Sequence, residues 1–199
     1  MLPVILAALL YISATSFAEA GVKISERTKY YSVKGKTGVQ LFGSILKKGP
    51  RKSKKGHAIA TTLSQLKIGK VRYKTKGKRC RAAPVTVRLK LTYTYPRWRN
   101  SRKASKRMRS SWNKFYARLQ RHEKTHGRYS KDFAREVERI IRRTTGSSRK
   151  RCRDAIAKAK RQIKRAEKKW RRRHAEFDRR ESKARSRIRR LQVSLMKSR

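Results

Sequence analysis

The strongest constraint on this chain is its charge. Among 199 residues, 61 are Lys or Arg and 11 are Asp or Glu, which gives a formal net charge of +50. Self-repulsion at this charge density opposes a compact state, so any core must be small and confined to segments with regular apolar periodicity. Eight Tyr, five Phe and three Trp supply material for such a core. The length and charge predict one small domain and exclude a large multidomain enzyme.

The first twenty residues differ in kind from the rest. Residues 1–20 are apolar and end in the small-x-small triplet Ala18-Glu19-Ala20, which is the pattern of a secretory signal peptide. We therefore expect cleavage after Ala20 and a periplasmic or secreted protein. No later run of apolar residues is long enough to cross a membrane.

Alternating and β-branched segments predict a sheet. Between Val85 and Tyr95 apolar and polar residues alternate, which indicates a strand with one buried face, and Pro96 is expected to end it. A strand is also predicted at 28–33, and two more at 58–75 with a break near Gly69.

Helical periodicity predicts three helices, at residues 37–49, 110–145 and 149–182. Ser110 or Ser111 is expected to cap the second of them, with Gly146 as its stop. Strands followed by two long helices predict an α+β fold in which an antiparallel sheet packs against the helices. We expect a signal peptide at 1–20, a single domain at 21–182 and a frayed basic tail at 183–199.

The pattern with most chemical content lies on the first long helix. His122-Glu123-Lys124-Thr125-His126 is an H-E-x-x-H motif, which places two imidazoles one turn apart, able to bind one zinc ion, with Glu123 aimed at a metal-bound water. The alternative is a pair of core histidines hydrogen-bonded to the backbone or to Glu123. Two histidines and an acid on an apolar helix face would then require buried partners, so the motif favours the metal site.

A catalytic zinc site requires a third protein ligand, which the sequence leaves open. Asp132 has the offset of the metzincin pattern, but Tyr129 stands where that pattern has its turn-making glycine, so a continuous helix would carry Asp132 away from the metal. The second long helix is the better source of the ligand, and its candidates are Glu181 as first choice, His174 as second, and Asp178, which shares a face with His174.

The two cysteines, Cys80 and Cys152, are expected to form a disulfide, because an even pair in an oxidising compartment is more often bridged than free. The first lies after a predicted turn at 76–79 and the second begins the last long helix. A bridge would therefore tie the sheet to the helical pair.

Together with the H-E-x-x-H helix and the two cysteines, two further segments resemble one family. They are Tyr-Tyr-Ser-Val-Lys-Gly at 30–35 and Leu-Thr-Tyr-Thr-Tyr-Pro-Arg-Trp at 91–98, followed by Trp112. Over roughly residues 28–178 the chain is similar to the secreted zinc-dependent proteases catalogued as domain of unknown function 922. The resemblance implies a zinc peptidase.

The chain departs from that family near its end. Its members typically end in Tyr-Asp-x-x-Thr-x-His-Gly, whereas this chain has Phe-Asp-Arg-Arg-Glu-Ser-Lys-Ala at 177–184. Asp178 is kept, Glu181 replaces the threonine and Lys183 replaces the histidine. This departure raises the alternative of a degenerate peptidase that keeps zinc for structure alone.

The leading hypothesis is an exported zinc-dependent metallopeptidase in which a metal-activated water attacks a peptide bond and Glu123 is the general base. Its substrate would be a peptide or protein, acidic ones included. The alternative is a non-enzymatic envelope protein that binds nucleic acid or other polyanions through its charge, with steep salt dependence. No recognisable nucleic-acid motif accompanies the charge, so readout of a specific base sequence is not expected.

Overall fold

The computed structural model describes residues 21–53, 56–149 and 151–199, so the expected signal peptide lies outside the described residues. The chain has the predicted mixed α+β composition. In order, its elements are β1 (Gly21–Val33), α1 (Gly38–Lys48), β2 (Arg51–Ser53), β3 (Gly56–His57), β4 (Thr61–Ile68), β5 (Tyr73–Lys76), β6 (Arg79–Ala82), β7 (Thr86–Trp98), η1 (Ser101–Lys103), α2 (Lys106–Arg143), β8 (Thr145–Ser147), α3 (Arg153–Ser182) and α4 (Arg187–Met196). Within these ranges no helix combines the length and apolar character that a bilayer crossing requires.

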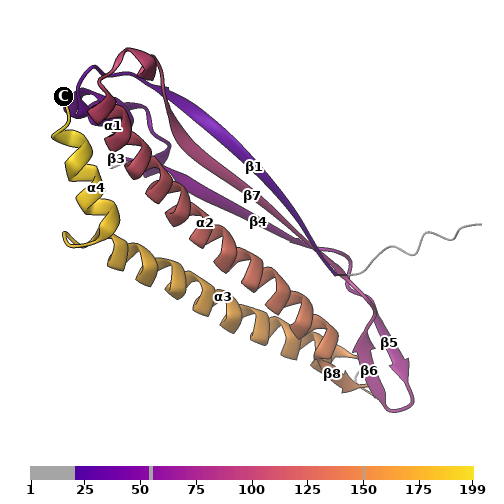
Figure 1. The fold of residues 1–199 in the computed structure, drawn as a ribbon. Helices are drawn as coiled ribbons and strands as arrows, with labels where there is room; N and C mark the ends of the chain where they lie inside the picture. The colour runs from indigo at the N-terminus through magenta and orange to yellow at the C-terminus, as the bar shows by residue number, and fades with distance from the viewer. Residues whose placement is uncertain (1–20, 54–55, 150) are drawn as a thin grey trace, which may run out of the picture.

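The elements form layers on either side of α2 (Figure 1). The main sheet has the strand order β1-β7-β4, and α2 packs along all three of its strands. On the opposite side, α2 contacts α3 and α4. The 38-residue helix α2 is therefore the middle layer, which explains why its apolar residues form so broad a stripe.

The main sheet is mixed, whereas an antiparallel one was expected. β4 runs antiparallel to β7, but β1 runs parallel to β7 along its whole length, from Gly21 opposite Thr86 to Val33 opposite Trp98. Parallel pairing needs a long crossover between the two strands. The segment between β1 and β7 contains α1 and the strands β2 to β6, so it is long enough to provide the crossover.

The strand β7 continues past Pro96, which was expected to end it. The antiparallel β4 begins at Thr61, opposite Thr94, and does not reach Pro96, so at Pro96 the strand has β1 as its one partner in the main sheet. A proline is tolerated where a strand has a single neighbour, because no ladder bond is lost on the open side. The prediction was wrong because the sequence does not reveal how long each neighbouring strand is.

The N-cap of α2 lies five or six residues before the predicted Ser110 or Ser111. The hydroxyl of Ser105 accepts a hydrogen bond from the Met108 amide, which makes Ser105 the N-cap. Met108 is fully buried and extends the apolar stripe by one turn. At its other end α2 stops at Arg143, and Gly146 pairs with Cys80 in the β6–β8 ladder. The second long helix, α3, ends at Ser182 as predicted but begins at Arg153, four residues after the predicted start.

The C-terminal stretch, predicted to be a frayed tail, is an ordered helix. Ser186 caps α4 by accepting a hydrogen bond from the Arg189 amide, and Leu195 is fully buried. The Gly38 amide at the start of α1 donates to the Ser198 carbonyl at 2.8 Å. These contacts fix the chain end against α1 (Figure 1), although few apolar residues mark the segment.

A second, smaller sheet with the order β5-β6-β8 lies at the far end of the long helices. The predicted disulfide is present there and joins Cys80 in β6 to Cys152, the residue before α3. It closes a separation of 72 residues. In the chain-entropy view, a loop of this size stabilises the fold by about 4 kcal/mol.

The contact between α2 and the main sheet depends on Gly127. A Cβ at this position would overlap the hydroxyl of Tyr93 in β7. The Tyr93 hydroxyl also donates a hydrogen bond to Glu26 in β1, at 3.2 Å, so the ring cannot move away freely. The glycine therefore lets α2 lie close against the sheet one turn after Glu123, directly behind the H-E-x-x-H motif.

We predict that Gly127→Ala lowers the free energy of unfolding by about 1–3 kcal/mol through overpacking, although alanine is the better helix former. The matched control is Gly43→Ala in α1, where a Cβ meets nothing within 4 Å and the change should stabilise by about 0.5–1 kcal/mol. Urea unfolding of both variants checks this. The contact has been misjudged if Gly127→Ala is as stable as Gly43→Ala.

Candidate metal centre

The H-E-x-x-H residues divide between the two packed faces of α2. His122 and His126 face α3, where both contact Phe177 and Asp178. Glu123, 100° further around the helix, faces the sheet, where its carboxylate accepts a hydrogen bond from the Thr62 hydroxyl of β4 at 2.6 Å. The motif therefore joins the two layers.

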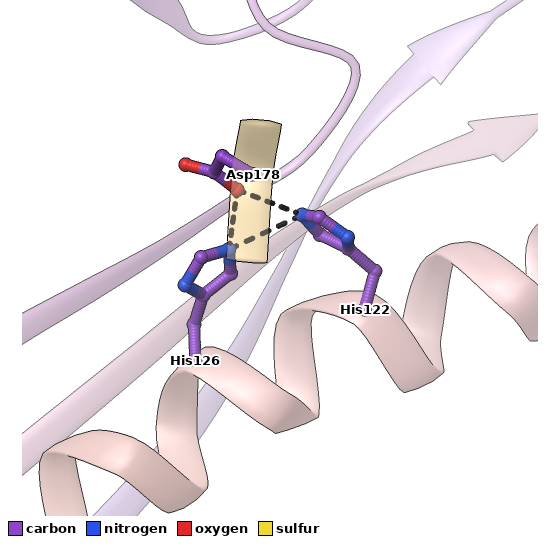
Figure 2. A group of neighbouring side chains, drawn as sticks. All are labelled: His122, His126 and Asp178. Atoms are coloured by element: carbon purple, nitrogen blue, oxygen red, sulfur yellow. Dashed lines mark hydrogen bonds and ion pairs between the residues drawn. The ribbon is translucent and has the colours of Figure 1, made fainter. Parts of the chain in front are cut away.

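Asp178 of α3 completes a compact group with the two histidines (Figure 2). The Nε2 atoms of His122 and His126 are 3.2 Å apart, and Asp178 Oδ1 lies 3.3 Å from the first and 2.9 Å from the second. The imidazoles are nearly buried, with side-chain exposures of 14% and 10%, whereas Asp178 is 45% exposed. One side of the group is thus open to solvent.

This triangle has the dimensions of a metal site. Tetrahedral zinc with bonds of about 2.0–2.1 Å places its ligand atoms about 3.4 Å from one another, close to the three separations here. Two imidazole nitrogens and a carboxylate oxygen are also donors that zinc accepts. His122, His126 and Asp178 could therefore hold a metal ion, with a coordination position left for a further ligand.

The charges around the group are unusual for so basic a chain. Seven acidic residues pair with Lys or Arg, namely Glu26, Asp132, Glu136, Glu138, Glu167, Glu176 and Glu181. Within the described ranges Glu123 and Asp178 make no ion pair with Lys or Arg, although basic residues outnumber acidic ones more than fivefold. Asp178, beside the two histidines, is therefore available to a cation, whereas the Glu123 carboxylate is held by Thr62 on the sheet side of α2.

Burial by itself would raise the pKa of Asp178. Hydrogen bonds from His122 and His126 outweigh that effect and bring the pKa of Asp178 well below its usual range. The carboxylate is therefore ionised at neutral pH, the state in which it can bind a metal.

His174, the second choice for the third ligand, lies behind His126. Its Nδ1 atom is 2.8 Å from His126 Nδ1, on the side of the His126 ring away from the triangle. Burial and the neighbouring His126 lower the pKa of His174 to about 4, so the ring is neutral at physiological pH. A neutral His174 can accept the Nδ1 proton of His126, which leaves the His126 Nε2 lone pair free for a metal.

Glu181, the first choice for the third ligand, lies near the other histidine. Its carboxylate binds Arg118 at 2.5 Å and is 3.8 Å from His122 Nδ1, the nitrogen that faces away from the triangle. That nitrogen is buried and has no hydrogen-bond partner among the described residues. A small shift of Glu181 would supply one, so its position suits orienting His122 better than binding metal. Asp132 lies outside the group and pairs with Arg173 at 3.2 Å.

Burial raises the pKa of Glu123, while the Thr62 hydrogen bond and the two histidines oppose that rise. The residue is 5% exposed. A carboxylate whose pKa is moved toward neutrality accepts and releases protons more readily at physiological pH. The environment of Glu123 therefore suits proton transfer.

Sequence reasoning missed the residues that hold the motif in place. Thr62 and Ser64 alternate on one face of β4, and they contact Glu123 and Ser130, which are seven residues apart on α2. The sequence shows both spacings: two hydroxyl residues two apart in a strand, and two polar residues seven apart in a helix. Each spacing places its two residues on one face of the element. The sequence does not show their pairing, because it depends on which strand α2 crosses.

The fold and the site define an α+β protein whose central helix and its neighbour bring together a group that could bind metal. The family of bacterial proteins of unknown function (DUF922) matches residues 28–185, and the chain belongs to this family. The match covers most of the main sheet and all of α2 and α3, so it includes the whole group. No curated protein and no solved structure matches the chain.

We predict that Asp178→Ala abolishes stoichiometric zinc binding, because it removes the one carboxylate of the triangle. His174→Ala and Glu181→Ala should weaken zinc binding about 10- to 100-fold, the effect of losing a residue that orients a ligand. Asp132→Ala is the matched control and should leave affinity unchanged. Competition with a chromogenic chelator measures all four. Zinc binding that survives in Asp178→Ala but is lost in Glu181→Ala would instead make Glu181 the ligand.

Proposed function

We propose that the chain is an exported zinc-dependent metallopeptidase. The observation that carries the proposal is the triangle of His122, His126 and Asp178, with Glu123 on the adjoining face of the same helix. Three protein ligands and one open position are typical of catalytic zinc, whereas structural zinc is usually enclosed by four. The partial exposure of Asp178 supports the open arrangement.

Each residue of the site has a role in this proposal. His122, His126 and Asp178 would hold the metal, which when bound supplies Lewis acidity toward a water and a peptide carbonyl. Glu123 takes a proton from the attacking water and delivers it to the leaving amine. Thr62 keeps the Glu123 carboxylate against the sheet through its hydrogen bond, and His174 holds the ring of His126 in place.

Export is part of the same proposal. Residues 1–20 have the apolar run and the small-x-small end of a secretory signal peptide. A disulfide between Cys80 and Cys152 suits an oxidising compartment. A periplasmic or secreted location also fits a zinc peptidase that acts on extracytoplasmic proteins.

We predict that Glu123→Gln in the mature protein keeps zinc but lowers hydrolysis by about 10²- to 10⁴-fold, because glutamine preserves the size of the side chain and removes the base. Metal content and cleavage of casein and of a fluorogenic peptide library are measured together. His126→Ala is the control, and it should lose the metal as well as the activity.

Two outcomes would contradict the proposal. Undiminished cleavage by Glu123→Gln would remove Glu123 from the reaction. Stoichiometric zinc without any chelator-sensitive hydrolysis in the unaltered protein would favour the degenerate, structural zinc site.

A further inference from the structure

A groove of about 630 Å³ runs between α2 and α3 beyond the metal centre. Its floor is apolar and includes Phe133, Ile140, Ala166 and Trp170, all of them half-buried. The rings of Phe133 and Trp170 stack on each other, with centroids 5.3 Å apart and planes 20° apart. The floor thus offers apolar surface that a ligand could cover.

The groove is separate from the face that carries Glu123. Asp132 and Arg139, which line it, lie about 160–180° around α2 from Glu123 at 100° per residue. A chain in the groove would therefore not occupy the position where Glu123 acts. It would form a second binding site on the other flank of the helix.

The groove nevertheless adjoins the residues that support the metal centre. Its lining residues Tyr129 and Trp170 both contact the ring of His174, at centroid distances of 5.5 and 4.7 Å. The Arg173 guanidinium, also in the lining, lies 3.9 Å from the Tyr129 ring centroid. At its inner end the groove is thus separated from His126 by His174, which contacts both.

The walls of the groove carry an excess of positive charge. Five lining residues are basic and two are acidic. Both acids are already paired, Asp132 with Arg173 and Glu136 with Arg139. Arg143, Arg165 and Lys169 have no acidic partner among the described residues, so three cations above an apolar floor remain available to a ligand.

We propose that this groove binds an acidic polypeptide segment that carries large apolar side chains. Carboxylates would meet the unpaired cations, and an aromatic or aliphatic side chain would cover the floor. From Tyr129 to Arg143 the helix rises about 21 Å, which matches about six residues of extended chain. A nucleic acid presents phosphates on its outside and would cover less of the apolar floor than a peptide with large apolar side chains. The groove therefore favours a peptide.

The test measures binding and needs neither metal nor catalysis. The mature chain with Glu123→Gln is titrated, by fluorescence anisotropy at 0.15 M salt, into a labelled peptide in which Glu alternates with Phe. A second peptide has Ala in place of Phe, and a duplex oligonucleotide serves as the polyanion probe. The groove variant is Arg165→Glu with Lys169→Glu.

The matched control is Lys160→Glu with Lys164→Glu, which makes the same charge change at the same spacing on α3 but outside the groove. We expect the groove variant to weaken the Phe peptide at least about tenfold. The control should weaken it no more than about threefold, because at 100° per residue its two positions lie about 120–160° around α3 from Ala166 in the groove floor. Ala166→Met, which fills part of the floor without changing charge, should weaken the Phe peptide and leave the Ala peptide unaffected.

Three results would overturn the proposal. They are equal losses in the groove and control variants, equal affinity for the Phe and Ala peptides, and a loss of oligonucleotide binding in the groove variant as large as that of the peptide. The last would make the groove part of a general polyanion surface. None of these results bears on zinc content or hydrolysis, so failure of the groove and failure of the proposed peptidase are distinguishable.

Discussion

The packing of α2 on two sides is the constraint on which the rest of the structure depends. A helix buried against a sheet on one face and against a second helix on the other must place two sets of side chains at once, and its sequence has little freedom along both stripes. The H-E-x-x-H motif lies where these stripes meet. His122 and His126 take the α3 side, and Glu123 takes the sheet side. The candidate site is therefore a product of layer order, since removing either neighbouring layer would remove Asp178 or Thr62.

Charge explains why the acidic residues are placed as they are. The chain has 11 acidic and 61 basic residues, so many cations compete for each carboxylate. Most of the acidic residues form exposed ion pairs, which contribute little to stability. Glu123 is kept from such pairing by burial against β4, and Asp178 by the two imidazoles. Among the described residues neither Glu123 nor Asp178 has a Lys or Arg partner, so each lacks a charge attraction that the paired acids have. A cation bound by Asp178 and the two histidines would restore such an attraction for Asp178.

The parts of the fold that were predictable depend on local patterns. The alternation in β7, the helical periodicity of α1, α2 and α3 and the disulfide were all evident in the sequence, because each reflects neighbours close along the chain or a simple pairing. Three features could not be predicted, because they depend on partners far away along the chain. They are the parallel pairing of β1, the continuation of β7 past Pro96 and the packing of α4 on the long helices. The site divides in the same way. The histidines and Glu123 were evident from their spacing, whereas the choice among Asp178, Glu181 and His174 needed the register of α3 against α2, which no single helix pattern contains.

That register has a further consequence for the site. His174, Phe177 and Asp178 lie on one turn of α3 and face α2. A shift of α3 along α2 by one residue, about 1.5 Å, would therefore break both the triangle and the His126–His174 contact. The Cys80–Cys152 bridge fixes the start of α3 to the small sheet at one end, and α4 packs on α2 and α3 at the other. Both anchors oppose such sliding. The features that lie far from the histidines, a disulfide and a short C-terminal helix, therefore maintain the alignment on which a metal site with ligands from two helices depends.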